Sequence, residues 1–388
     1  IGNELDQVSL ALRTGRSGVR RIEEFVALDL NSQVAGIPSI ADEPLIDRKI
    51  RRYMGDAAIY AYCAMRRAIA DAGLSAEEVA SPRAGLVVGS GVGSGHHLIE
   101  AVDIMRARGM HKVPPYEVPR IMASSASACL STGFGVRGVS YSMSSACATS
   151  AHCIGNAFDL VASGRQDIVF AGGSEEIGWP GMLLFGAMGV LSTAHNEAPE
   201  AASRPYDAVR DGFVLAGGGG IVVVEALEHA RARGARAYLE ITGYGASSDG
   251  CDMVVPSAEG PAAAMADAAE TLGQPVDYIN THATSTPQGD AAEVKAMQSV
   301  FGDAVPAFSS TKGITGHPIA AAGVHEAIYC ALMMRDGFLA GSPTLQALDP
   351  AVEGLPLVRQ SRYMRVDTML SNSLGFGGTN VSLAFRRI

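Results

Sequence analysis

The chain has 388 residues, enough to bury one large core or to form two fused domains. Hydrophobic residues make up 47% of the chain and charged residues 18%, a composition typical of globular rather than disordered proteins. The net charge of −10 excludes a general nucleic-acid partner, which requires a basic face, and no apolar run reaches the roughly 20 residues of a membrane-spanning helix.

Helix and strand patterns alternate along the first half of the chain. The run GDAAIYAYCAMRRAIADAGLS has apolar residues at helical spacing and ends at Gly73, a typical helix stop. RAGLVVGSGVG is a short apolar run that leads into glycines, which is typical of a buried strand. The expected elements, in chain order, are a helix over 55–75, strands over 83–93 and 138–146, a helix from Cys147 to about Ser163, and strands over 166–176 and 217–227.

The pattern begins again after a basic helix that ends near residue 235. The expected elements are a strand over 236–249, a helix over 259–273, a strand over 275–286, a helix over 289–302, a loop and helix over 306–335, and two strands around a glycine turn over 368–385. Two such series predict an α/β protein of two similar halves, 1–235 and 236–388, each a sheet with helices on its faces. Only the second half opens with a strand, so we expect a short strand before IGNELDQ.

The cysteines indicate a protein with reduced thiols. Six of them are spread along the chain without a C-x-x-C pair, whereas disulfide frameworks belong to small secreted domains. The first residues, IGNELDQVSL, lack the basic start and apolar block of a signal peptide. We therefore expect a cytoplasmic protein.

Cys147 stands where a strand turns into a helix, in the stretch SYSMSSACATSAHCIG (140–155). The N–H groups and dipole of a helix N-terminus favour a thiolate, which makes such a cysteine a candidate nucleophile. The alternative is a buried cysteine that packs at a tight turn. The neighbouring His152 and Cys153 lie inside the helix and are expected to pack there.

Two of the nine histidines stand where an element changes type. His282 follows VDYIN in a Thr/Ser-rich loop, and His317 lies in TGHP just before a helix. Functional groups gather in such loops at strand ends. Lys312 precedes His317, and Glu293 is its candidate partner; a buried pair of this kind would position groups rather than add stability. The alternative is that both are ordinary surface residues.

Five stretches, in this order, resemble the β-ketoacyl-acyl-carrier-protein synthases, the condensing enzymes of the thiolase fold. They are SSACATSAHCIG around Cys147, SRPYDAVRDGFVLAGGGG (203–220), THATSTPQGD (281–290), TKGITGHPIAAAG (311–323) and NSLGFGGTN (372–380). The run ACATSAHCIGNA is most similar to the synthase I branch of bacterial type II fatty-acid synthesis. The resemblance implies a five-layered α-β-α-β-α fold. It also implies a decarboxylating Claisen condensation of an acyl thioester with malonyl-acyl-carrier protein, which gives 3-oxoacyl-acyl-carrier protein.

The resemblance further implies roles for the candidate catalytic residues. Cys147 would carry the acyl group, which divides the condensation into two easier steps. His282 and His317 would donate hydrogen bonds to the enolate oxygen. Lys312 and Glu293 would hold the histidines in position and tune the local charge.

The C-terminal glycine turn and the loop after His282 are implied to bind the substrate. The backbone N–H groups of Phe376 and of the nucleophile would hold the oxyanion, and Phe376 would act as a gate. Gly375 and Gly377 would allow the close backbone approach. Thr284 and Thr286 would bind the pantetheine amides.

The same resemblance implies the partners. Substrates would arrive on the phosphopantetheine of an acidic acyl carrier protein, with no metal and no bound cofactor. Steering such a carrier needs a basic docking site, for which Arg48, Lys49, Arg51 and Arg52 in DRKIRRYM are candidates; the alternative is a solvated helix face. Because family members form homodimers, we expect a homodimer.

The sequence departs from the family pattern in three places. Ala283 replaces the usual glycine after the first histidine, Pro318 and Ala320 replace small residues after the second, and the opening strand is absent. The substitutions leave the acyl-chain preference open.

Other classes fit less well. GSGVGSG fails the G-x-G-x-x-G spacing of a dehydrogenase because residue 96 is histidine, GGGG lacks the G-K-[ST] of a phosphate loop, and no H-E-x-x-H zinc motif occurs. A degradative thiolase needs a second, C-terminal cysteine, but the last one is Cys330. A polyketide-type ketosynthase and a non-catalytic carrier-protein-binding scaffold remain as alternatives.

Overall fold

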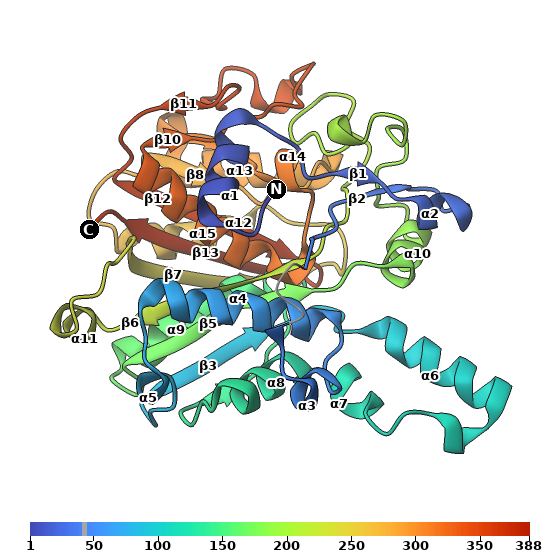
Figure 1. Ribbon diagram of the computed structural model, residues 1–388. Helices are drawn as coiled ribbons and strands as arrows, with labels where there is room; N and C mark the ends of the chain where they lie inside the picture. Colours follow the sequence, from blue (N-terminus) through green and yellow to red (C-terminus); the bar gives the residue numbers. More distant parts are fainter. Residues whose placement is uncertain (41–44) are drawn as a thin grey trace.

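Two mixed β-sheets organise the chain (Figure 1). The structure is a computed structural model that describes residues 1–40 and 45–388. The first sheet uses strands from residues 84 to 225, and the second uses strands from 240 to 386. Each sheet combines parallel and antiparallel pairs.

The first sheet places its two most buried strands at the centre. Its order is β4–β3–β5–β6, in which β3 runs parallel to β4 and β5, and β6 runs antiparallel to β5. Every residue of β3 and β5 is buried, which explains why both occur in the sequence as continuous apolar and glycine runs. The bounds are Ala84–Gly89 (β3), Ser140–Tyr141 (β4), Ile168–Glu175 (β5) and Gly218–Glu225 (β6).

The second sheet has five strands in the order β7–β13–β12–β8–β9. Its β12 and β13 form the predicted hairpin around a glycine turn, and β12 also runs parallel to β8. The bounds are Glu240–Ser248 (β7), Tyr278–Asn280 (β8), Ala307–Ser309 (β9), Thr368–Gly375 (β12) and Thr379–Arg386 (β13).

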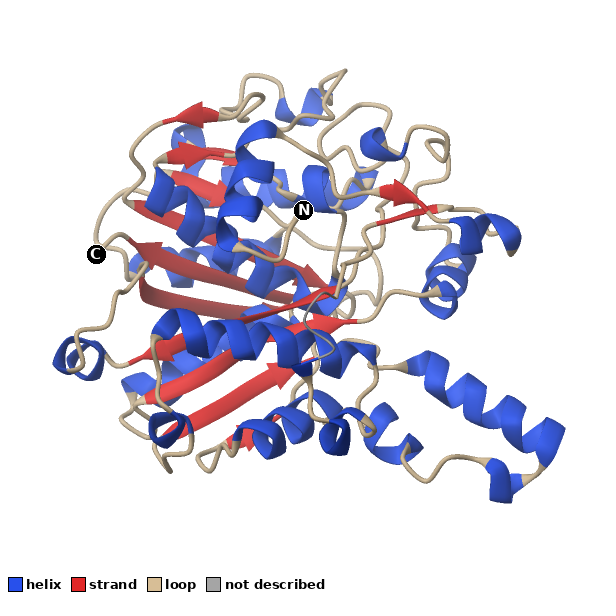
Figure 2. Cartoon of the chain, viewed as in Figure 1, coloured by secondary structure: helices blue, strands red, loops and turns tan. Residues whose placement is uncertain are grey.

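Helices cover both faces of each sheet and give the five layers that the resemblance implies (Figure 2). Two helices lie between the sheets, α9 (Thr149–Ala162) and α15 (Ala322–Asp336). The outer face of the first sheet carries α4 (Asp56–Ala72) and α8 (Ser125–Phe134), and that of the second carries α12 (Glu259–Glu270) and α13 (Pro287–Phe301). The predicted α-β-α-β-α architecture is confirmed.

The segment before α9 differs from the prediction. The expected strand over 138–146 is reduced to β4, and the expected helix begins at Thr149 rather than at Cys147. The reason is local: the Thr149 hydroxyl accepts the N–H of Ser145 (2.8 Å) and donates to the carbonyl of Ala146 (2.7 Å). Ala146 has a φ of 50°, so the chain makes a strained turn before it becomes helical.

A helical arm projects from the first half, where the sequence pattern indicated only glycine turns and polar segments (Figure 1). It consists of α6 (Gly95–Arg108), the 3₁₀ turn Met110–Lys112 and α7 (Glu117–Ile121). No residue of α6 is buried, so the arm offers no core-facing stripe that periodicity would detect. Beside it lies α10 (Trp179–Ala187), and several apolar side chains of this region are exposed, namely Leu98, Met105, Met110, Val118, Leu183, Leu184 and Met188.

Shorter elements complete the described chain. They are α1 (Leu5–Thr14), β1 (Arg20–Arg21), α2 (Glu23–Ala27), β2 (Val34–Ala35), α3 (Arg48–Arg51), α5 (Ala76–Val79), α11 (Leu227–Ala232), α14 (Lys312–Thr315), β10 (Phe338–Leu339) and β11 (Arg362–Tyr363). Within residues 1–40 and 45–388, no helix combines the length and apolar character needed to cross a membrane.

Candidate active site

Three segments distant in sequence bring Cys147, His282 and His317 together. Cys147 lies in the strained turn before α9, His282 follows β8, and His317 follows α14. The sulfur of Cys147 and one ring nitrogen of each histidine all lie within 4.8 Å of one another. The two imidazole rings meet edge to face with centroids 5.1 Å apart. All three side chains are buried, so a reaction among them proceeds away from bulk water.

Both histidines are neutral near pH 7. Burial lowers the pKa of each imidazole well below its ordinary value, and the Lys312 charge lowers it further. Within the described residues, Nδ1 of His282 and both ring nitrogens of His317 have no hydrogen-bond partner. The imidazoles are therefore free to bind a substrate oxygen.

The low pKa of these imidazoles predicts the acidic limit of activity. A group with a lowered pKa stays unprotonated to a lower pH, so we expect single-turnover condensation to persist below the ordinary histidine pKa of about 6.5. Rapid-quench measurements between pH 5 and 8 test this. A loss of rate with a midpoint at 6.5 or above would contradict it.

Burial has the largest effect on the pKa of the Cys147 thiol. It raises the pKa of Cys147 to about 12, against the lowering effects of the Lys312 charge and of the N–H groups of Phe376 and Cys147. The expected gain from a helix N-terminus is therefore outweighed in the resting protein. The thiol is therefore protonated near pH 7.

The glycine turn brings a backbone donor to the Cys147 sulfur. The N–H groups of Phe376 and of Cys147 itself are both directed at the Cys147 sulfur. A Cβ atom on Gly375 would lie 2.9 Å from the carbonyl oxygen of Ser145 and 3.3 Å from the nitrogen of Cys147, so this approach requires glycine. Gly377 has a φ of 81° and donates to the carbonyl of Met253 (2.8 Å), which fixes the turn.

An apolar wall lies next to Cys147. Cys147 belongs to one buried cluster with Met182, Phe213 and Ile319. Phe213 packs edge to face on His317, and Phe185 lies between Phe213 and Phe376, with ring centroids 5.6 and 6.5 Å away. An alkyl chain attached to Cys147 would lie against these side chains.

The structure corrects the predicted partner of Lys312. Its ammonium pairs with Glu326 on α15, not with Glu293, and both members of the pair are at most 2% exposed. Burial raises the pKa of Glu326 to about 7, and Lys312 opposes this rise. Glu293 instead accepts the N–H of His282 (2.9 Å) and of Ala283 (2.8 Å), so it positions the first histidine through the backbone.

Removing one member of the buried Lys312–Glu326 pair should destabilise the folded protein. Glu326→Gln is expected to lower the free energy of unfolding by about 3 kcal/mol, because it leaves the Lys312 charge without a counter-ion. Urea denaturation followed by circular dichroism measures this. The double variant Lys312→Met/Glu326→Leu is the matched control and should regain most of the stability. An unchanged midpoint for the single variant would contradict the expectation.

The loop after His282 contains the two predicted threonines and a support that the sequence analysis missed. Thr284 and Thr286 lie with their hydroxyl oxygens 3.2 Å apart. Asp290 accepts the N–H of Ser285 (3.1 Å) and lies 3.1 Å from the guanidinium of Arg210. Burial raises the pKa of Asp290 to about 6, and Arg210 opposes this rise. The sequence did contain a signal for this support, because the charged residues Arg210 and Asp290 stand within the motifs SRPYDAVRD and PQGD.

The departures from the family pattern lie on both sides of the histidines. The Ala283 methyl packs into the core of the second half with Tyr206. Pro318 precedes the 3₁₀ turn Ile319–Ala321, and the N–H of Ala320 donates to Glu175 (3.3 Å). Pro318 and Ala320 therefore flank Ile319, which belongs to the buried cluster around Cys147.

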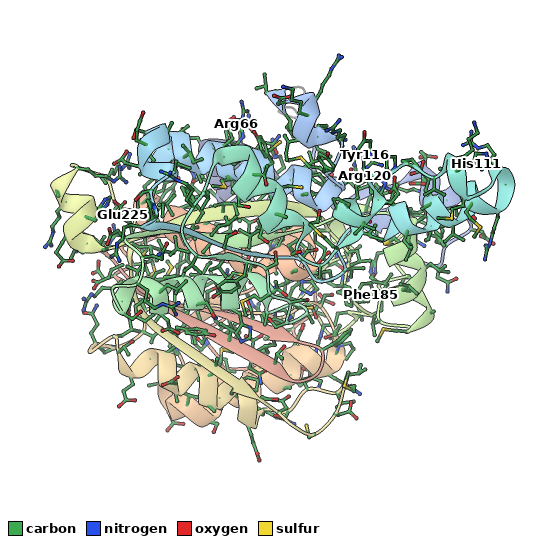
Figure 3. The ribbon with its side chains drawn as sticks, turned by 90° about the horizontal axis from the view of Figure 1, so that it is seen from below. Arg66, His111, Tyr116, Arg120, Phe185 and Glu225 are labelled. Atoms are coloured by element: carbon green, nitrogen blue, oxygen red, sulfur yellow. The ribbon has the colours of Figure 1, made fainter. Side chains whose placement is uncertain are left out.

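The candidate docking residues Arg48, Lys49 and Arg51 lie on the short helix α3, and Arg52 follows its last residue. Arg48, Lys49 and Arg52 are exposed, whereas Arg51 is half-buried. The Arg52 guanidinium stacks on the rings of Tyr53 (4.8 Å) and Tyr116 (5.1 Å), and its carbonyl accepts Nε of Arg120 (3.1 Å). Figure 3 places Tyr116 and Arg120 next to each other. We call Arg48, Lys49, Arg51 and Arg52 the basic surface; the neighbouring Arg120 is paired with Glu117 (2.9 Å).

Comparison with known proteins identifies the class. The chain belongs to the beta-ketoacyl synthase family: residues 1–230 match the N-terminal domain of that family and residues 238–346 match its C-terminal domain. It is 54% identical to 3-oxoacyl-[acyl-carrier-protein] synthase 1 of Haemophilus influenzae and 53% identical to that of Escherichia coli, in each case over 100% of this chain and 96% of the relative.

Solved structures agree with the fold. A beta-ketoacyl synthase from Burkholderia phymatum superimposes with a TM-score of 0.94 at 35% identity, over 100% of this chain and 96% of that one. A type II polyketide ketosynthase, solved in complex with its acyl-carrier protein, superimposes with a TM-score of 0.90 at 26% identity over the same shares. The thiolase fold and the family resemblance are both confirmed.

Proposed function

We propose that this chain catalyses the decarboxylating Claisen condensation that extends an acyl chain in type II fatty-acid synthesis. The observation that carries the proposal is the convergence of the Cys147 sulfur and two neutral imidazoles within 4.8 Å. The 53–54% identity to two 3-oxoacyl-[acyl-carrier-protein] synthases 1 supports it. Intact-protein mass spectrometry after incubation with acyl-carrier proteins of increasing chain length tests it, because acylated Cys147 carries the mass of the chain.

In the first step the acyl group moves from the pantetheine thioester to Cys147. The Cys147 sulfur attacks the carbonyl carbon, the bond from that carbon to the pantetheine sulfur breaks, and the thiol proton passes to the departing sulfur. The N–H groups of Phe376 and Cys147 stabilise the oxyanion of this step. The apolar wall next to Cys147 receives the chain.

In the second step the malonyl group loses CO₂. The electron pair of the broken carbon–carbon bond forms an enolate, whose oxygen accepts hydrogen bonds from His282 and His317. The enolate carbon attacks the acyl carbonyl, and the bond to the Cys147 sulfur breaks. A proton then restores the thiol, and 3-oxoacyl-carrier protein leaves.

We propose that the acidic acyl carrier protein docks on the basic surface. Arg48→Glu/Lys49→Glu is expected to raise KM for acyl-carrier protein roughly tenfold at low salt, because rim charges act mainly on encounter. The kcat should change little. Arg231→Glu, an exposed charge reversal on α11, is the control. Equal KM values for the double variant and the control would contradict the proposal.

We propose a homodimer as the working form. The outer edge of β4 is unpaired among the described strands, and elsewhere the arm and α10 expose the apolar side chains named above. Such surfaces are typical of protein interfaces. Sedimentation equilibrium tests the assembly.

Three further proposals concern organisation and setting. We divide the chain at residue 235, a boundary supported by the separate sheets of the two halves. We place the protein in the cytoplasm, where the six free cysteines would stay reduced. Phosphopantetheine enters as part of the substrate, and the proposed steps route through no metal.

A polyketide ketosynthase is the second candidate, favoured by the structural similarity to a ketosynthase bound to its carrier protein. The same mass-spectrometry series separates the two. A fatty-acid enzyme should take a saturated acyl chain onto Cys147 and extend it once per malonyl unit. A product that gains several unreduced units in one incubation would favour the polyketide class.

A further inference from the structure

Glu175 is a buried carboxylate that the proposed chemistry does not use. It is the last residue of β5 and is 1% exposed. Its Oε1 accepts the Ser90 hydroxyl (2.9 Å) and the Val92 N–H (3.1 Å), and its Oε2 accepts the N–H groups of Gly91 (2.8 Å) and Ala320 (3.3 Å). One side chain therefore joins the loop after β3 to the turn that follows His317.

That turn is strained. Ile319 has a φ of 43°, a region that β-branched residues rarely enter. Its side chain lies in the same buried cluster as Cys147 and Phe213. Such strain persists only where the surroundings fix the backbone, and the Ala320 N–H, directly after Ile319, is held by Glu175.

The loop after β3 packs against the same turn. A Cβ atom on Gly91 would lie 2.7 Å from Oε2 of Glu175, 3.3 Å from the Ile319 side chain and 3.5 Å from that of Ala320. The upstream side of the turn is fixed separately, because the N–H of His317 donates to Val214 (2.7 Å) and its carbonyl accepts from Ala216 (2.9 Å). Glu175 supplies the restraint on the downstream side.

We propose that Glu175 is a positioning residue for condensation, which holds the Ile319–Ala320 turn and thereby fixes His317 and the apolar wall relative to Cys147. This inference rests on the function proposed above. It assigns Glu175 to the enolate step, in which His317 must point at the substrate oxygen.

Burial raises the pKa of Glu175 to about 7, so only part of the protein carries its negative charge at pH 7, and that charge disfavours the Cys147 thiolate. Its proximity contributes to the raised pKa of Cys147. Removing the charge would therefore ease acylation, while loosening the turn would impair condensation. This split distinguishes a positioning role from a general loss of structure.

Glu175→Gln tests the proposal with almost no change in shape. The new amide nitrogen cannot accept a hydrogen bond, so one orientation removes the acceptor of the Gly91 and Ala320 N–H groups and the other removes that of the Val92 N–H. Glu175→Ala removes both oxygens and is measured beside it. We expect acylation of Cys147 at the wild-type rate or faster, and condensation slowed roughly tenfold to a hundredfold. Intact mass measures acylation, and 3-oxoacyl product measures condensation. Wild-type condensation, or equal loss of both steps, would overturn the proposal.

Glu225→Gln is the matched control. Glu225 lies at the opposite end of the same strand pair, opposite Ile168, where it binds Arg233. Figure 3 shows it across the molecule from Phe185, which lies near the acyl site. This variant should condense normally. If the wild type and this control both fail to condense, the proposed function itself is wrong.

A double-mutant cycle tests the route through the turn. Ile319→Gly removes the strain, because glycine accepts a positive φ. The cost of Glu175→Gln should then be smaller in the Ile319→Gly background, whereas independent effects would multiply and overturn the proposal. If Glu175→Gln does not fold, as judged by thermal unfolding, Glu175→Asp replaces it. The shorter side chain withdraws from Ala320, and the same split between the two steps is expected.

Discussion

Cys147→Ala is expected to abolish both acylation and condensation, with a loss on the order of 10⁴-fold or more, because the acyl group then has no covalent carrier. The substitution removes one sulfur atom from a turn of small residues, and the hydrogen bonds of Thr149 to that turn do not involve the thiol. The fold should therefore survive. A variant that still elongates acyl chains at the wild-type rate would refute the nucleophile assignment.

The measurement must separate Cys147 from the other thiols. Cys251 is exposed and Cys63 is half-buried, so both react with general alkylating reagents sooner than a buried thiol whose pKa is near 12. An acyl-carrier protein substrate avoids this problem, and a Cys251→Ser background removes the most exposed thiol. Cys153→Ala is the control: Cys153 is fully buried in α9, and this variant should still be acylated at Cys147.

Much of the architecture could be predicted because burial leaves a direct pattern in the sequence. The strands β3 and β5 are buried on both faces and therefore occur as continuous apolar runs. The pattern over 55–75 also predicts where the helix ends, and in the structure Gly73 adopts the left-handed conformation at the C-terminus of α4. The turn between β12 and β13 likewise coincides with the glycines of GFGG.

The partner of Lys312 could not be predicted by the same means. Glu293 and Glu326 are both carboxylates on helices, and nothing local distinguishes them. The choice follows from the layers: α15 lies between the two sheets, where Glu326 reaches the ammonium, whereas Glu293 on α13 faces the backbone of His282. Pairing across layers is a property of the assembled fold.

The raised pKa of Cys147 could not be predicted from the sequence either. A helix N-terminus lowers a cysteine pKa and burial raises it, but the sequence does not give the depth of burial. Here the turn at Ala146 places the thiol inside the molecule, ahead of the first helical residue. The thiol is therefore protonated and neutral near pH 7.

His317→Ala should separate the two chemical steps. Acylation of Cys147 is expected to continue, since the backbone N–H groups of Phe376 and Cys147 serve that step, while condensation should fall roughly 10²- to 10⁴-fold because the enolate loses a donor. Mass spectrometry of the acyl-enzyme and release of labelled CO₂ from malonyl-carrier protein measure the two steps separately. His229→Ala is the control: His229 lies on α11, where it pairs with Glu225 at the end of β6, and its loss should leave both steps unchanged.

His317→Asn completes this test. Its side-chain amide can still donate a hydrogen bond but cannot titrate, so condensation should recover in part if donation to the enolate is the role of His317. If the residue instead acts as a base, asparagine should be as poor as alanine. Because His317 is neutral at pH 7, donation is the role that its protonation state supports, and CO₂ release by His317→Ala at the wild-type rate would refute it.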